Sequence, residues 1–148
     1  MKTSLGYPDH DSTVSLLAGA SDRNRAASIQ PVITAKAASG MARAADGVYV
    51  DVGILSYISQ IAEQSRHAPR LKLGLSVRGC LALVRAAKTW AASQGRNYVI
   101  PDDIKDLALP VLGHRLLLDA EAEFAGVRIE DVIEGLLGVV EPPSERAS

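Results

Sequence analysis

The sequence predicts an all-α fold, a bundle of about six helices in a single domain. Three observations support this fold class. Apolar residues recur at helical spacing in nearly every long apolar stretch of the 148-residue chain. Strand-like patterns are confined to Tyr49-Val50 and Leu116–Leu118, and the chain contains no internal repeat. An apolar content of 47% is sufficient to build one core.

The first third of the chain carries the weaker helix signals. Pro8-Asp9 predicts a helix over residues 9–18 that is capped by Asp9. Its predicted apolar side consists of Val14, Leu16 and Leu17. Residues 19–31 are polar and rich in small side chains, so they are predicted to form a loop. A second helix is expected over residues 32–45, on the apolar positions Val32, Ile33, Ala37, Met41 and Ala44.

The two clearest helices follow in the middle of the chain. Asp51 caps a helix that ends at residues 66–69, with an apolar stripe made of Ile54, Leu55, Ile58, Ile61 and Ala62. Ser76 caps the longest helix, over residues 77–94, and Gly95 closes it. Two adjacent apolar stripes predict that this helix is central: Val77, Leu81, Val84 and Ala91, and then Leu83, Ala87 and Trp90. Its polar sector contains Arg78, Arg85, Lys88 and Thr89.

The last part of the chain predicts two further helices. Residues 101–103, Pro-Asp-Asp, are a strong helix start, because proline suits the first turn and carboxylates favour the positive end of the helix dipole. This helix is expected to end near Gly113. Residues 115–118 are expected to be extended and residues 119–126 to form a surface loop. A final helix over residues 129–139 turns four side chains inward, Val132, Ile133, Leu136 and Leu137.

Composition excludes several classes of protein. Lys plus Arg number 16 and Asp plus Glu 17, so no overall positive field favours sequence-independent binding of nucleic acid. No apolar run approaches the roughly 20 residues that cross a bilayer, and the first residues lack the apolar centre of a signal peptide. We therefore expect a cytoplasmic protein without a membrane span. The single Cys80 excludes an internal disulfide, and three scattered histidines leave no cysteine-based metal cluster.

Most residues with reactive side chains have a structural explanation. The sequence contains neither a phosphate-binding loop of the form GxxxxGK[ST] nor the dinucleotide glycine fingerprint. His10, His67 and His114 have no neighbouring serine or cysteine in a nucleophile context. Cys80 is predicted to be a small core residue and Trp90 a core anchor.

Arg78 is the exception, because it lies in the first turn of a predicted helix. There the positive end of the helix dipole disfavours a cation by about 0.3–1 kcal/mol at an exposed site. An anion held at this helix end would make the arginine useful. The alternative is a solvated arginine whose stem covers apolar surface, and the physics of the residue favours neither interpretation over the other.

Four stretches, in this order and spacing, resemble the C-terminal lid of MoxR-type AAA+ ATPases. The family typically shows G-A-S-P-R-A, a helix ending in A-x-x-x-G-R-x-Y-V, then T-P-D-D-V and a closing P-V-L-x-H-R-L. The matching stretches here are Leu73-Gly74-Leu75-Ser76-Val77-Arg78-Gly79, Leu83-Val84-Arg85-Ala86-Ala87-Lys88-Thr89-Trp90-Ala91, Gly95-Arg96-Asn97-Tyr98-Val99-Ile100-Pro101-Asp102-Asp103-Ile104 and Pro110-Val111-Leu112-Gly113-His114-Arg115-Leu116. Residues 5–8, Leu-Gly-Tyr-Pro, are similar to the end of the family's ATPase core, so the resemblance covers nearly the whole chain.

The resemblance departs from the family pattern at three positions around Arg78. Val77 stands in place of the usual proline, and Leu75 and Gly79 stand in place of alanines. Gly79 is expected to loosen the first turn of the helix by up to about 1 kcal/mol. None of these changes removes the arginine.

The resemblance implies a fold of the AAA+ lid type and assigns a role to the arginine. Residues 1–8 would be the end of the preceding ATPase core or a linker, and residues 9–140 the helical lid. The composition of residues 141–148 predicts a disordered tail. Arg78 matches the sensor-II residue, which reaches from the lid to the phosphates of ATP bound on the core, and Ser76 is the helix cap beside it. No catalytic residue and no metal ligand is expected in this chain.

The resemblance also implies cofactors and partners. ATP and Mg²⁺ would be cofactors of the intact protein, an ATPase that hydrolyses ATP, whereas no cofactor is expected for this chain alone, which would be inactive. Partners would be the ATPase core of its own chain, further copies in a homo-oligomeric ring, a hexamer, and proteins with von Willebrand A domains, with which the family often acts. The activity would be chaperone-like remodelling of a client that the sequence does not identify.

Two alternatives from other classes stay open at this point. The first is an autonomous helical protein-interaction module, in which Arg78 and Arg85 only shape a polar surface. The second is a helical domain that binds nucleic acid. The near-neutral net charge and the lack of a helix dense in arginine and lysine argue against the second alternative.

Overall fold

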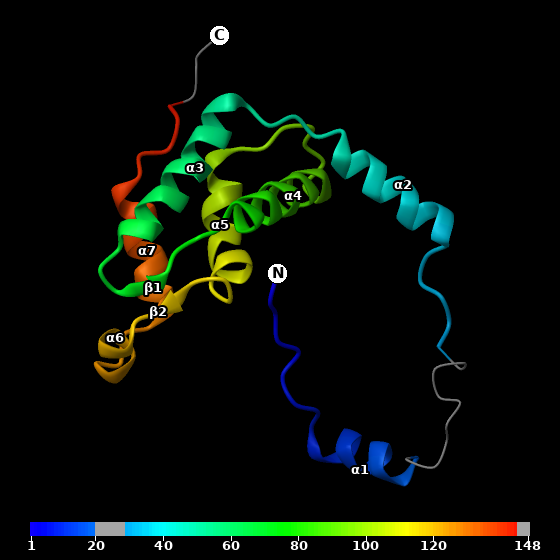
Figure 1. The fold of residues 1–148 in the computed structure, drawn as a ribbon. Coiled ribbons are helices and arrows are strands. Elements are labelled where there is room, and N and C mark those ends of the chain that lie inside the picture. The colour runs from blue at the N-terminus through cyan, green and yellow to red at the C-terminus, as the bar shows by residue number, and fades with distance from the viewer. Residues whose placement is uncertain (20–28, 145–148) are drawn as a thin grey trace.

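The computed structural model describes residues 1–19 and 29–144. Within these ranges the chain forms seven helices and one two-stranded sheet (Figure 1). The elements in chain order are α1 (His10–Ala18), α2 (Ala35–Asp46), α3 (Val52–His67), β1 (Leu71–Leu73), α4 (Val77–Ser93), α5 (Pro101–Leu112), β2 (Leu117–Leu118), α6 (Ala120–Phe124) and α7 (Ile129–Val139). The predicted all-α class is confirmed, with one helix more than expected.

Parts of two predictions lie outside the described residues. They are residues 20–28 of the predicted loop and residues 145–148 of the predicted tail. Residues 141–144 follow α7 without regular secondary structure. No helix in the described ranges is both long enough and apolar enough to cross a membrane.

Helices α4 and α5 form the centre of the core. Leu83 and Ala87 of α4 are completely buried, as are Ile104 and Ala108 of α5. Helices α2 and α3 pack against α4, and α7 packs against α3 and α5. Burial of one leucine or isoleucine side chain contributes about 1.5–3 kcal/mol to folding. The complete burial of Leu83 and Ala87, with three helices packed against α4, confirms the predicted central position of the longest helix.

Side-chain caps set the helix starts as the sequence predicts. The Asp9 carboxylate accepts a hydrogen bond from the N–H of Ser12 at 2.8 Å. The Asp51 carboxylate accepts one from the N–H of Gly53 at 2.7 Å. Each bond satisfies a backbone donor that has no partner inside the helix. Helix α5 begins at Pro101, also as predicted.

Helix α2 begins later than predicted. The hydroxyl of Thr34 accepts a hydrogen bond from the N–H of Ala37 at 3.1 Å, so Thr34 is the cap and α2 starts at Ala35. Val32 and Ile33, which were predicted to be its first apolar positions, lie before the helix and are exposed. The apolar spacing extended the predicted helix across a residue that is chemically suited to start one.

The predicted surface loop over residues 119–126 is wrong, because this segment contains α6. Asp119 accepts a hydrogen bond from the N–H of Ala122 at 2.7 Å and caps the helix. Ala122 is buried, whereas Phe124 is 97% exposed. With one buried side chain in five residues, the helix has no apolar period that the sequence could display.

The sheet joins two segments that are distant in the chain. Strand β1 pairs antiparallel with β2, with Leu71 opposite Leu118 and Leu73 opposite Leu117. The N–H of Asp119 extends this pairing with a 3.1 Å hydrogen bond to the carbonyl of Arg70. Strand β2 lies inside the stretch that was predicted to be extended, whereas β1 was not predicted. The sheet connects the segment that follows α3 with the segment that follows α5.

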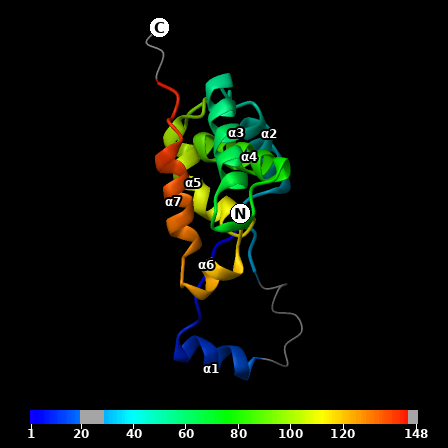
Figure 2. The same cartoon turned by 60° about the vertical axis from the view of Figure 1, so that its left-hand side comes forward.

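Several predicted core positions are exposed. Helix α1 buries no residue, and it stands apart from the other helices in both views (Figure 1, Figure 2). Its apolar residue Leu17 is 71% exposed. In α4, Val77 and Leu81 are 67% and 52% exposed, and Trp90, the predicted core anchor, is 39% exposed. The buried face of α4 consists of Gly79, Leu83, Ala87 and Ala91, and Trp90 lies outside it.

Candidate functional site

Arg78 and Ser76 lie together at the start of α4, as predicted. The Ser76 hydroxyl accepts a hydrogen bond from the N–H of Gly79 at 3.3 Å and caps the helix. The Ser76 carbonyl accepts hydrogen bonds from the N–H groups of Gly79 and Cys80 at 2.8 and 3.1 Å. Arg78 is exposed and has no ion-pair partner in the described part of the chain. The arginine is thus available to an anion from outside this chain.

The segment before Ser76 is fixed to α3. The N–H of Leu75 donates a hydrogen bond to the hydroxyl of Ser65 at 2.8 Å, and that hydroxyl donates to the carbonyl of Ala62 at 2.7 Å. The Nε atom of Arg66 donates to the carbonyl of Leu75 at 3.0 Å. Leu75 and Ser65 are both 1% exposed. These bonds fix the first turn of α4 relative to the end of α3.

Gly74 allows this close approach. A Cβ atom at Gly74 would lie 2.7 Å from the Cα and N atoms of Arg66 and from the carbonyl oxygen of Ser65. These atoms belong to the backbone of a helix, which cannot move aside as a flexible side chain can. The glycine is part of the segment that resembles the family pattern, but the sequence does not indicate this packing role.

Gly79 has a packing role that the sequence reasoning missed. It is buried, and a Cβ atom there would overlap the Cδ1 atom of Leu75. The same Cβ atom would stand 3.6 Å from the Cδ atom of Arg115. The glycine lets Leu75 and Arg115 pack against the first turn of α4, in addition to the loosening predicted from helix propensity.

Cys80 behaves as the predicted packing residue. It is half-buried against the core, and its thiol contacts the carbonyl of Ser76 at 3.5 Å. Burial raises the pKa of the thiol, and the nearby charge of Arg66 opposes this shift. A thiol with a raised pKa is a poor nucleophile near neutral pH.

The stretch around Arg96 joins the end of α4 to the start of α5. Its guanidinium donates two hydrogen bonds to the Asp103 carboxylate, at 2.8 and 2.5 Å. The carboxylate also accepts a bond from the N–H of Ile100 at 2.9 Å and is almost completely buried. The hydrogen bonds to Asp103 raise the pKa of Arg96. Asp103 is therefore structural, as the helix-start interpretation predicts.

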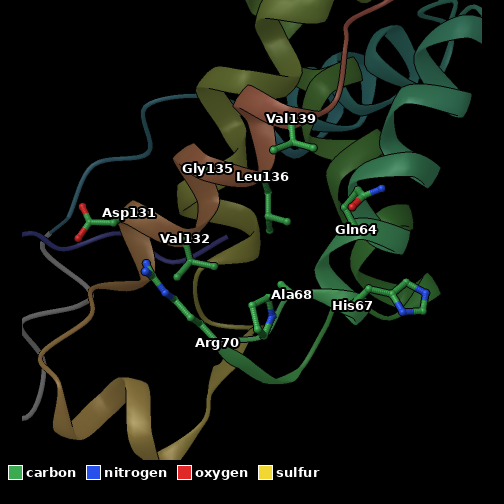
Figure 3. Close-up of a pocket in the computed structure, with 10 residues that line it drawn as sticks. Gln64, His67, Ala68, Arg70, Asp131, Val132, Gly135, Leu136 and Val139 are labelled. Carbon is green, nitrogen blue, oxygen red and sulfur yellow. The ribbon is translucent and has the colours of Figure 1, made fainter.

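A separate cavity of about 420 Å³ lies between the end of α3 and α7 (Figure 3). Val132 and Leu136 contribute apolar surface to it, and Arg70 and Asp131 contribute charged groups. Neither Arg78 nor Ser76 lines this cavity. The sequence contains no signal for it, because its two walls come from helices that are far apart in the chain.

These features define a helical domain whose central helix presents an unpaired arginine in its capped first turn. The family model described as the AAA lid domain matches residues 63–136, which is half of the chain. The match includes α4, α5 and the segment that links them. The chain belongs to the AAA lid domain family.

The relatives indicate the type of AAA lid domain to which the chain belongs. The chain is 33% identical over 147 residues to the uncharacterized protein YeaC of Bacillus subtilis, covering 99% of this chain and 46% of YeaC. It is 30% identical over 108 residues to the chaperone MoxR1 of Mycobacterium tuberculosis, covering 67% of this chain and 29% of MoxR1. A crystal structure of a predicted ATPase from Cytophaga hutchinsonii matches with a TM-score of 0.75 and 27% identity, covering 95% of this chain and 45% of the other.

The chain is accordingly a lid of the MoxR-like AAA+ ATPase type. It spans less than half of the length of these three relatives.

Proposed function

We propose that this lid closes over ATP bound on an ATPase core, and that Arg78 contacts the phosphates as the sensor-II residue. The observation that carries the proposal is the exposed, unpaired Arg78 in the first turn of α4, at a helix end that is bonded to α3. An arginine binds phosphate oxygens with two parallel N–H donors. The N-terminal end of a helix adds a favourable field for the same anion.

Among the described residues, the donors at the start of α4 fit ATP phosphates better than they fit a metal ion. In the described residues no group of three or more His, Cys, Asp or Glu side chains could hold a metal. In the proposal, Mg²⁺ is therefore held by the core, together with the groups that activate water. ATP bound there supplies the transferable phosphoryl group. Arg78 orients this group and neutralises part of its negative charge.

Further parts of the proposal extend to the intact ATPase. We propose a cytoplasmic, homo-oligomeric ring, a hexamer, in which ATP hydrolysis rotates lid against core and remodels a client protein in a chaperone-like way. The name of the relative MoxR1 supports the chaperone part of this proposal. A protein with a von Willebrand A domain is the proposed partner, and nucleic acid is not.

Substitution of Arg78 in the intact ATPase that carries this lid tests the proposal. Arg78→Ala is expected to lower the hydrolysis rate at saturating ATP strongly, since arginines that contact a transferring phosphoryl group contribute about 10³–10⁵-fold in comparable sites. Arg85→Ala is the matched control, because Arg85 is also exposed and lies two turns along the same helix. It is expected to hydrolyse ATP at nearly the wild-type rate.

Stability measurements on the chain alone complete this test. Arg78→Ala is expected to leave its thermal stability unchanged, or to raise it slightly through relief of the dipole penalty of about 0.3–1 kcal/mol. A wild-type hydrolysis rate for Arg78→Ala, or a loss of several kcal/mol of lid stability, would show that Arg78 is structural.

A further inference from the structure

Arg115 lies beside the first turn of α4, although it follows α5 in the chain. Its Cδ atom would stand 3.6 Å from a Cβ atom at Gly79, so the arginine stem fills space next to that glycine. Gly79 directly follows Arg78, and adjacent Cα atoms are about 3.8 Å apart. The Cδ atom of Arg115 is therefore within about 9 Å of the Cα atom of Arg78. Two arginine side chains at this separation can reach one polyphosphate.

Contacts at the end of α5 hold Arg115 in this place. Its Nε atom donates a hydrogen bond to the carbonyl of Val111 at 3.0 Å. Its backbone N–H donates to the carbonyl of Leu112 at 2.8 Å. The side chain is half-buried, in contrast to that of Arg78. A side chain already held in one conformation loses less entropy when it binds a ligand.

The hydrogen bond to Val111 uses only one of the donors of the Arg115 side chain. An arginine can cap the last carbonyls of a helix, and the Nε–H group of Arg115 does so for α5. A guanidinium has five N–H donors, of which Nε–H is one. In the described part of the chain, the ion pairs of arginine side chains involve Arg96 and Arg128, and the Nη groups of Arg115 have no partner.

We propose that Arg115 is a second phosphate-binding residue, which contacts the same polyphosphate as Arg78. This inference rests on the proposed function, because the ligand is the phosphate chain of ATP bound on the core. Arg78 approaches that chain from the exposed side of the first turn. Arg115 approaches from the side of Gly79 and adds a second, preorganised guanidinium.

The whole chain, labelled with nitrogen-15, tests the inference with sodium tripolyphosphate as the probe at low ionic strength. We expect the Nε–H signals of Arg78 and Arg115 to shift together in NMR spectra, with one common dissociation constant in the millimolar range. The signal of Arg85 is the internal control and is not expected to shift. This titration needs no variant, so it does not depend on whether a substituted chain folds.

A conservative variant distinguishes phosphate binding by the donor fork of Arg115 from a general effect of its positive charge. Arg115→Lys keeps the charge but removes the planar fork of donors. It is expected to weaken tripolyphosphate binding about tenfold, the loss of one charge-assisted hydrogen bond. Arg85→Lys is the matched control and is expected to bind like the wild type. Circular dichroism on each variant checks that it is folded.

Three outcomes would overturn the inference: a silent Arg115 signal, wild-type binding by Arg115→Lys, or an equal shift of Arg85, which would indicate non-specific attraction. The first two would leave Arg115 as a cap of α5 only. None of them would decide the proposed function, which fails on a different result, a wild-type hydrolysis rate for Arg78→Ala in the intact ATPase.

Discussion

Among single residues, Tyr57 places an unfavourable polar group in the core. Its side chain is 1% exposed, and its hydroxyl has no hydrogen-bond partner in the described part of the chain. Burial raises the pKa of this phenol, and the charge of Lys105 opposes the shift. Leaving a buried hydroxyl unpaired costs about 1–3 kcal/mol. The aromatic ring, rather than the hydroxyl, explains why Tyr57 is in the core.

Tyr57→Phe is therefore expected to leave the free energy of unfolding unchanged or to raise it by about 1 kcal/mol, as measured by urea denaturation. Ser65→Ala is the matched control, because it removes a buried hydroxyl that has two partners, Ala62 and Leu75. That variant is expected to lose about 1–3 kcal/mol. Equal losses in the two variants would mean that the Tyr57 hydroxyl is satisfied after all.

At the scale of the secondary-structure elements, local chemistry was predictable and distant pairing was not. The starts of α1, α3, α4 and α5 follow from a cap residue or a proline, which act within one turn. Strand β1 depends on β2, which is far away in the chain, and it is too short to show an alternating pattern. Helix α6 is too short to show a helical period.

The turn between α4 and α5 depends on the ion pair between Arg96 and Asp103, which are seven residues apart and which no helical or strand period identifies as partners. Arg96→Ala would leave the almost fully buried Asp103 carboxylate without its charged partner. Removal of one member of a buried ion pair costs about 3–5 kcal/mol, and the partial exposure of Arg96 favours the lower end. We expect a loss of about 3 kcal/mol in the free energy of unfolding, measured by chemical denaturation.

Lys105→Ala is the control for this prediction, since Lys105 pairs with the exposed Asp102, which lies one turn earlier in the same helix. Exposed pairs contribute about 0–1 kcal/mol. If Arg96→Ala cost no more than Lys105→Ala, the Arg96 pair would not hold the two helices together.

At the scale of the whole molecule, the candidate site combines a predictable part with an unpredictable part. Arg78 and Ser76 are two positions apart in the chain, so one predicted helix start places them on the same turn. Arg115 and Arg66 come from other elements, and only the packing around Gly79 and Leu75 brings them to that turn. Sequence periodicity also cannot distinguish the core from an apolar surface, as exposed Leu81 demonstrates.

Burial and hydrogen bonding predict which part of the chain the bundle needs for its stability. Helix α1 buries no side chain, and in the described residues the backbone bond from Lys2 to Pro110 is the hydrogen bond that joins its segment to the bundle. Deletion of residues 1–31 is therefore expected to lower the thermal midpoint by no more than about 5 °C, since one backbone hydrogen bond contributes about 1 kcal/mol, which shifts the midpoint of a domain of this size by about 3–5 °C. Differential scanning calorimetry measures this midpoint.

Deletion from residue 128 onward is the contrasting control, because it removes α7 and its buried residues Val132, Ile133 and Leu136. Their loss removes several kcal/mol of apolar burial, and cooperative unfolding is expected to disappear. A large fall in the midpoint after deletion of residues 1–31 would place α1 among the elements that stabilise the bundle. A small effect would confirm that α1 does not contribute to the stability of the bundle.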